Sequence, residues 1–341
     1  MDDLSIPARR LRTMLRTAMG EGMAEALNNP AVFEIMVNPD GCVRLDLAGE
    51  GRIDTGVVLS APDVERVIRL VASHVRTEIN MDSPIVSAEL PGGEGGLGGE
   101  RFEGLLPPVV TAPCFSIRKP AYRLFGLDDY VATGIMTAPQ AKVLSRAVRH
   151  RDNILVVGGT SSGKTTLTNA LLAEVAKLDE RVILIEDTRE LRCDARDVVA
   201  LRTRAGSVTM SDLVRSTLRL RPDRIIVGEV RGREALDMLK AWNTGHPGGI
   251  ATLHANSANG ALLRLEQLVQ EAVANVPRPL IAEAIDLIVF ICGANSQTGQ
   301  PRHVADIVTL NGLDVNGAYD LQPLDLSGEE TLSIPSYTQE T

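Results

Sequence analysis

Gly158-Gly159-Thr160-Ser161-Ser162-Gly163-Lys164-Thr165 is the stretch of this sequence that says most about its fold. The octet matches the phosphate-binding loop (Walker A) pattern G-x-x-x-x-G-K-[ST] at every fixed position. It follows the apolar run 154–157, which suits a buried parallel strand. Apolar residues then recur at helical spacing between residues 165 and 176. A strand, a glycine-rich loop and a helix in this order predict a nucleotide-binding loop, because a chance match would lack the flanking elements.

Each residue type in the loop has a chemical role in holding a nucleotide. Glycines let the backbone wrap a phosphate and point its N–H groups inward, and the N-terminus of the following helix adds a partial positive charge. We expect Lys164 to reach the β- and γ-phosphates and the Thr165 hydroxyl to hold Mg²⁺. The predicted ligands of ATP in this loop are Gly158, Gly159, Thr160, Ser161, Ser162, Gly163, Lys164, Thr165 and Thr166.

The composition is ordinary for a soluble globular protein and leaves room for two domains. The chain has 341 residues, of which 44% are hydrophobic and 23% are charged. Its net charge of −9 gives no indication of a basic face at the level of the whole chain, so tight nucleic-acid binding is not favoured. No apolar stretch approaches the roughly 18 residues of a membrane span, and the first residues do not resemble a signal peptide. The four cysteines are far apart, which is typical of free thiols in a cytosolic protein.

Two regions with different patterns follow one another along the chain. Residues 1–122 predict a smaller α+β domain, in which 7–27 forms one amphipathic helix that we expect to pack on its own domain. A linker is expected over residues 123–136. In residues 137–341 strands alternate with helices, which predicts an α/β domain with a parallel sheet and helices on both of its faces.

Two carboxylates stand where strands of the second region end. Glu186 and Glu229 each close an apolar strand, and ligands of open α/β sheets bind beyond the carboxyl ends of strands. Glu186 is therefore a candidate for positioning Mg²⁺. Glu229 is a candidate for polarising the attacking water, because Gly228 occupies the position where such enzymes usually carry an aspartate. The alternative is that Glu229 is an ion-pair partner of Arg231 or Arg233.

Histidines and arginines add weaker signals. His254 closes a strand and is placed to sense a γ-phosphate, although His254 or His246 taken alone would more often have a structural role. The segment 189–233 contains eleven arginines and six acidic residues. These arginines either pair with local carboxylates, neutralise phosphate, or act on a neighbouring subunit. A DNA-binding stripe is poorly supported, because aromatic residues make up only 3% of the chain.

The order of these motifs resembles that of the secretion ATPase superfamily, which serves type II and type IV secretion and pilus systems. The motifs are, in order, the phosphate-binding loop 158–165, the acidic box 186–190, the segment 218–231 and the histidine box 244–256. The segment 235–249 is most similar to the conjugal transfer ATPases of the TrbB type. The resemblance extends over about residues 30–310. The missing aspartate before Glu229 departs from phosphate-loop enzymes in general but not from this family.

The resemblance implies more than the motifs show. It implies a homohexameric ring whose subunits have an N-terminal domain and a RecA-like motor domain, with ATP and Mg²⁺ between the two. It implies that Arg101 and Arg118 reach the nucleotide, although from the sequence alone they are only arginines near strand ends. It also implies a cytoplasmic ring that docks peripherally on inner-membrane components of the secretion machine, without a span of its own. The tetracysteine insert common in type II motors is absent from this sequence.

We therefore interpret the chain as an ATPase that hydrolyses ATP to ADP and phosphate, with Mg²⁺, to drive a conjugative type IV secretion machine. Lys164 binds phosphates, Thr165 holds Mg²⁺, Glu229 polarises water with help from Glu186, and His254 senses the γ-phosphate. The alternatives are a type II secretion or type IV pilus motor and a RecA-like translocase that binds DNA directly. A small-molecule kinase is disfavoured, because the sequence shows neither a lid region nor a substrate pocket.

Overall fold

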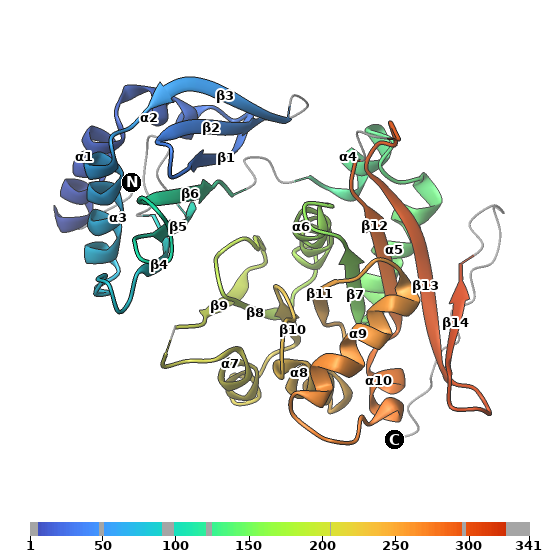
Figure 1. Cartoon of the computed structure of the whole chain (residues 1–341). Helices are drawn as coiled ribbons and strands as arrows, with labels where there is room; N and C mark the ends of the chain where they lie inside the picture. The colour runs from blue at the N-terminus through green and yellow to red at the C-terminus, as the bar shows by residue number, and fades with distance from the viewer. Residues whose placement is uncertain are drawn as a thin grey trace. The chain divides into compact units, whose positions relative to one another are not determined.

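Two separate sheets organise the chain in the computed structural model (Figure 1). The structure describes residues 6–47, 51–90, 99–120, 125–204, 206–294 and 298–324, and the glycine-rich stretch 91–98 lies outside them. One unit comprises Met1–Arg123 with Thr188–Glu190, and the other comprises Leu124–Asp187 with Leu191–Thr341. Within the described residues, no helix combines the length and the apolar character that crossing a membrane would need.

The N-terminal unit is an antiparallel sheet with three helices. The sheet order is β3-β2-β1-β6-β5-β4. The strands are β1 (Val32–Val37), β2 (Cys42–Leu47), β3 (Gly51–Val58), β4 (Ile85–Glu89), β5 (Arg101–Leu105) and β6 (Cys114–Arg118), and the helices are α1 (Ile6–Met19), α2 (Glu21–Asn28) and α3 (Ala61–His74). The prediction of one helix over 7–27 is wrong, because the chain turns at Gly20 with φ of 80° and starts a second helix.

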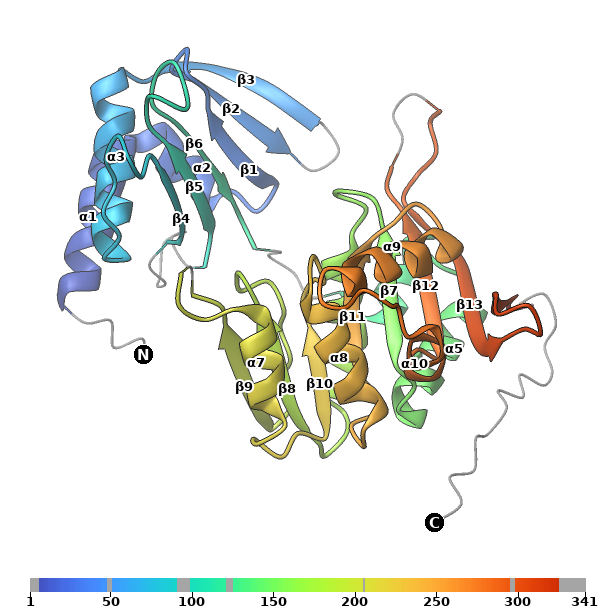
Figure 2. The same cartoon turned by 60° about the horizontal axis from the view of Figure 1, so that its bottom comes forward.

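One face of this sheet is buried and the other is polar. Ile35, Phe102 and Ile117 are completely buried, and the residue before each of them in its strand is polar. Helices α1 and α3 lie side by side over the buried face (Figure 2). The Ser60 hydroxyl caps α3 by accepting a hydrogen bond from the Asp63 N–H at 3.3 Å. The period-2 pattern thus leaves a row of charged side chains on the opposite face.

The second unit is a mixed sheet of order β14-β13-β12-β7-β11-β10-β8-β9. The strands from β12 to β9 run parallel, which confirms the predicted parallel sheet, whereas β13 and β14 are antiparallel additions. Its strands are β7 (Ile154–Gly158), β8 (Arg181–Glu186), β9 (Asp197–Arg202), β10 (Arg224–Val227), β11 (Ile250–His254), β12 (Leu287–Cys292), β13 (His303–Leu313) and β14 (Tyr319–Pro323). Its helices are α4 (Leu127–Ala132), α5 (Ala138–His150), α6 (Lys164–Val175), α7 (Met210–Thr217), α8 (Glu234–Asn243), α9 (Ala258–Gln270) and α10 (Arg278–Ala284). Helix α4 lies within the stretch that we expected to be a linker.

Helices cover this sheet on both faces. Helices α7 to α10 pack on one side and share a core with Leu155 and Val157 of β7. Helices α4 to α6 pack on the other side, where Ile154 and Val156 point. Because every residue of β7 is buried, the end of this strand is a rigid base for whatever loop follows it.

Close packing explains part of the arginine-rich and histidine-box sequences. The Trp242 side chain is buried, and its Nε1 donates a hydrogen bond to the Ile225 carbonyl at 3.1 Å. A Cβ on Gly249 would lie 2.1 Å from two atoms of the Trp242 ring, so no side chain fits there. Arg224 is also fully buried, where it pairs with Glu180 and donates to the Val148 carbonyl at 2.7 Å. The contact of Trp242 with Gly249 and the buried Arg224 therefore stabilise the core and do not form a ligand site.

We expect Gly249→Ala to lower the free energy of unfolding by about 1–3 kcal/mol, because the new methyl group overpacks the Trp242 site. In a unit of this size the midpoint Tm of thermal unfolding would fall by about 3–10 °C. Gly22→Ala is the control, since a Cβ there meets nothing within 4 Å and a helical alanine is neutral or stabilising. Unchanged unfolding of Gly249→Ala would contradict the packing described.

Candidate active site

The phosphate-binding loop is wound tightly between β7 and α6. Ser161 and Gly163 have φ of 58° and 102°, so the chain passes twice through the left-handed region before α6 begins at Lys164. A Cβ on Gly158 would lie 2.4 Å from the Ile291 carbonyl oxygen and 2.5 Å from Ser162 Oγ. A glycine is therefore required at the first position of the loop.

Lys164 is the buried cation of this loop. Its side chain lies among the buried residues, and its ammonium donates to the carbonyls of Gly158 at 3.0 Å and Gly159 at 2.9 Å. The same nitrogen lies 3.3 Å from both ring nitrogens of His254. The loop thus curls around its own lysine, which is held at the N-terminus of α6, where phosphates bind in loops of this sequence.

Strand register brings the predicted residues of the site together. In the parallel sheet His254 pairs with Gly158, and β10 lies on the other side of β11. Glu229 follows the end of β10, so its carboxylate reaches the same edge, where its Oε1 lies 3.0 Å from His254 Nε2. Lys164, His254 and Glu229 are separated by up to 90 positions in the sequence and form one continuous series of contacts in the structure.

The charges around Glu229 determine the protonation states of Glu229 and His254. Arg231 pairs with Glu229, and its other nitrogen lies 3.7 Å from Asp187. Burial works to raise the pKa of Glu229, but the hydrogen bond and charge of Arg231, with the charges of His254 and Lys164, outweigh it and lower that pKa. Burial and then the charge of Lys164 lower the pKa of His254, against an opposite effect of Glu229. The carboxylate is thus ionised and the imidazole neutral at pH 7. The ion pair between Glu229 and Arg231, which the sequence offered as an alternative role for Glu229, is present in the structure.

A second carboxylate fills the position of the missing aspartate. Glu186 is buried, and its Oε1 accepts a hydrogen bond from the Leu191 N–H at 2.7 Å. A Cβ on Gly228 would lie 3.0 Å from Glu186 Cγ, so this side chain uses the space that a side chain at 228 would need. A carboxylate and the Thr165 hydroxyl are oxygen ligands of the kind that Mg²⁺ prefers. In the described part of the chain no group of three or more His, Cys, Asp and Glu side chains could hold a metal by itself. The donor set fits an ion that is shared with phosphate oxygens.

Arg101 and Arg118 belong to the N-terminal unit, on its polar sheet face. They are directly opposed residues of β5 and β6. Glu34 stands opposite Arg118 on β1, and Glu89 stands opposite Arg101 on β4, so two arginines lie between two glutamates across the sheet. The cross-strand pair offers two cations at one place. That these cations reach a nucleotide stays a prediction.

Arginines of the segment 189–233 have several separate roles. Arg224 is buried in the core, Arg215 pairs with Asp237 at 3.0 Å, and Arg231 pairs with the carboxylate at the site. Pairing with local carboxylates, the plainest of the alternatives, therefore accounts for at least these three. His246 likewise contacts the Pro222 carbonyl at 3.1 Å, which is a structural contact.

Sequence reasoning missed Arg302, which also contacts the loop. Its guanidinium donates a hydrogen bond to the Ser161 carbonyl at 3.2 Å, across 141 positions of sequence. A Cβ on Gly163 would lie 3.3 Å from Arg302 Cδ and Nε. In the sequence, Arg302 directly precedes the residues of β13 (His303–Leu313), and no motif includes it.

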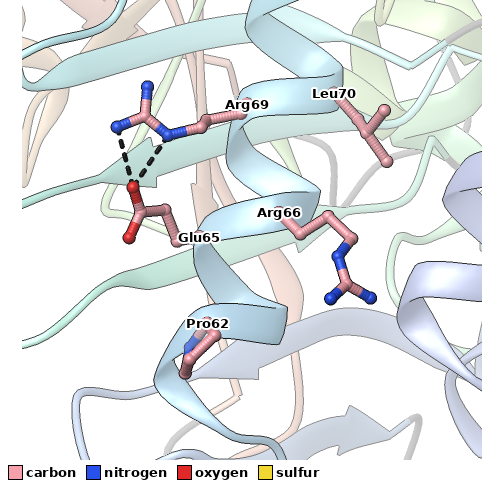
Figure 3. Close-up of a pocket in the computed structure, with 5 residues that line it drawn as sticks. All are labelled: Pro62, Glu65, Arg66, Arg69 and Leu70. Carbon is pink, nitrogen blue, oxygen red and sulfur yellow. Dashed lines mark hydrogen bonds and ion pairs between the residues drawn. The ribbon is translucent and has the colours of Figure 1, made fainter.

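A shallow hollow of about 440 Å³ lies elsewhere, along α3 (Figure 3). Its lining residues all come from that helix and are Pro62, Glu65, Arg66, Arg69 and Leu70. Glu65 and Arg69 are joined by an ion pair of 2.7 Å one helical turn apart. An open surface of one helix with an i,i+4 ion pair has no convergent chemistry, so the phosphate-binding loop remains the candidate site.

Histidine titration by NMR tests the chain of contacts without any catalytic assay. We expect His254 to titrate below pH 6.5, because burial and Lys164 disfavour its charged form. Lys164→Ala removes a cation and should raise the pKa of His254. Glu229→Gln removes an anion and should lower it further. The exposed Lys142→Ala on α5 is the control and should leave the titration unchanged. Equal titration curves in all variants would mean that these groups are not neighbours.

The chain is similar to known proteins over most of its length. Residues 59–311 match the family model described as type II/IV secretion system protein. The chain is 46% identical over 322 residues to a probable conjugal transfer protein TrbB of Sinorhizobium fredii, covering 94% of this chain and 95% of that protein. It is 47% identical to the conjugal transfer protein TrbB of Rhizobium radiobacter, covering 89% and 91%.

A solved structure confirms the fold class. The ATPase DotB of Legionella pneumophila superposes with a TM-score of 0.58 at 19% identity, over 86% of this chain and 80% of that one. The predicted RecA-like α/β domain with a smaller N-terminal domain is thereby confirmed. The family match and the two TrbB relatives confirm the predicted superfamily. The chain belongs to the type II/IV secretion system protein family of traffic ATPases.

Proposed function

We propose that this protein hydrolyses ATP to ADP and phosphate and thereby drives a conjugative type IV secretion machine. The observation that carries the proposal is the meeting of Lys164, His254 and Glu229 at one phosphate-binding loop. Family membership supports an ATPase, and the two relatives described above are named as conjugal transfer proteins. An ionised carboxylate beside a buried lysine is what phosphoryl transfer to water requires.

Lys164, Glu229 and His254 have distinct roles in this reaction. Lys164 exchanges its bonds to the loop carbonyls for bonds to the β- and γ-phosphates, and the N–H groups of residues 158–166 bind the remaining phosphate oxygens. Glu229 orients the attacking water and accepts its proton, for which its lowered pKa keeps it ionised. His254 joins Glu229 to Lys164 and so couples the carboxylate to the occupancy of the γ-phosphate position.

Thr165 and Glu186 would hold Mg²⁺, the first through its hydroxyl and the second through its buried carboxylate. When bound, the ion neutralises charge on the β- and γ-phosphates. Glu186 itself is oriented by its hydrogen bond from the Leu191 N–H, which keeps the carboxylate at the end of β8.

The assembly that we propose is a homohexameric ring that is cytoplasmic and peripheral at the inner membrane, where it docks on components of the secretion machine. Arg101 and Arg118 are proposed to act on the nucleotide, supported by their position as an opposed pair on β5 and β6. Tight nucleic-acid binding is not proposed, since the net charge is −9 and arginines such as Arg215 and Arg224 are used in protein contacts.

Two variants separate binding from hydrolysis. Lys164→Ala should reduce hydrolysis by roughly 10²-fold or more, because a cation that stabilises transition-state charge is lost. Glu229→Gln should still bind ATP with Mg²⁺ but turn over slowly, since an amide accepts no proton. The measurements are phosphate release and equilibrium binding of ATP.

Lys142→Ala on the exposed face of α5 is the matched control for the lysine variant. A Lys164→Ala protein with most of its turnover would refute the proposed site. Loss of ATP binding in Glu229→Gln, with unchanged turnover per bound ATP, would reassign Glu229 to binding.

A ring that shares its site between subunits should be more active when assembled. We expect turnover per subunit to rise with protein concentration, and Arg118→Ala to reduce hydrolysis by about tenfold or more while affecting ATP binding less. Arg52→Ala, on the exposed strand β3, is the control. Sedimentation measured beside turnover checks this. A monomer with full, concentration-independent activity would exclude a shared site.

A further inference from the structure

The order of the strands gives the bound nucleotide a direction across its loop. Strand β7 carries the loop and lies between β11 and β12. His254 at the end of β11 and Glu229 after β10 lie on one side, so the γ-phosphate and the attacking water belong there. The nucleoside at the other end of ATP must then extend toward the side of β12 and β13.

Arg302 is the side chain that reaches the loop from that second side. It precedes His303, whose partner across the hairpin of β12 and β13 is Cys292. The same end of the hairpin touches the loop through Gly293, where a Cβ would lie 3.3 Å from Ser162 Cα. The hairpin therefore fixes where the guanidinium stands.

We propose that Arg302 binds the nucleoside end of the nucleotide, with the purine base stacked on the flat face of its guanidinium. The inference rests on the proposed function, because it takes ATP as the ligand of this loop. It names a residue for the base, whereas Lys164, Thr165 and Glu229 concern only phosphates, metal and water.

The contacts of Arg302 hold its guanidinium in one orientation. One edge of the guanidinium is bound to the Ser161 carbonyl, and Gly163, at the point where α6 begins, lies against Cδ, Nε and Cζ and so backs one side of the group. The residue is half-buried, and its Nε has no hydrogen-bond partner. A guanidinium that is held by one edge and backed on one side keeps its other face in a fixed orientation, and such a face stacks well on aromatic rings.

Two nucleotide fragments separate this role from a structural one. ADP and inorganic pyrophosphate, each with Mg²⁺, share the phosphates, but only ADP has a base. Their dissociation constants would be measured by calorimetry on the full chain as wild type, Arg302→Ala and Arg302→Lys. Arg264→Ala on the exposed face of α9 is the matched control, and thermal unfolding checks that each variant is folded.

We expect both Arg302 variants to bind ADP about tenfold more weakly, because even lysine lacks the flat face, while pyrophosphate binding changes by less than about twofold. Equal weakening of both ligands would overturn the proposal and make Arg302 a clamp of the loop. Full ADP affinity in Arg302→Lys or in Arg302→Ala would also overturn it. Because calorimetry of ADP needs no turnover, a wild type that binds ADP but hydrolyses no ATP would refute the proposed function without refuting this role.

Discussion

The site depends on one constraint, which is that strand β7 is buried on both faces. Residues Ile154 to Gly158 have helices on either side, so the end of the strand cannot shift without disturbing two cores. The loop that follows begins with a glycine that has no room for a Cβ, and it then passes through two left-handed residues. Rigid packing below and tight winding above together hold Lys164 in place.

Electrostatic interactions set the protonation states of the side chains at this site. Two cations, Lys164 and Arg231, stand on either side of one carboxylate, Glu229, and a neutral imidazole lies between the lysine and the carboxylate. In this balance the carboxylate is easier to ionise and the histidine is harder to protonate. In the function proposed above, a phosphate bound at Lys164 would change the charge felt by His254 and hence by Glu229. The contacts would then connect nucleotide occupancy to the group proposed to act on water.

Much of the second unit could be predicted, and less of the first. The alternation of apolar strands and amphipathic helices is strong where strands are buried on both faces, and there the predicted elements agree with the structure. The edge strands β3, β4 and β14 have no continuous apolar run, so the sequence does not predict them. The break at Gly20 was missed, because the apolar positions remain nearly in phase across it.

The sequence by itself determined the phosphate-binding loop, since eight consecutive residues dictate its winding and its chemistry locally. Only the tertiary structure decided which charges meet there. Arg224 and Arg231 stand seven positions apart in one arginine-rich segment, yet one is buried in the core and the other holds Glu229. Arg302 reaches Ser161 from 141 positions away because the antiparallel hairpin of β12 and β13 lies beside β7. Strand order and register make such long-range contacts, and no local pattern of residues encodes them.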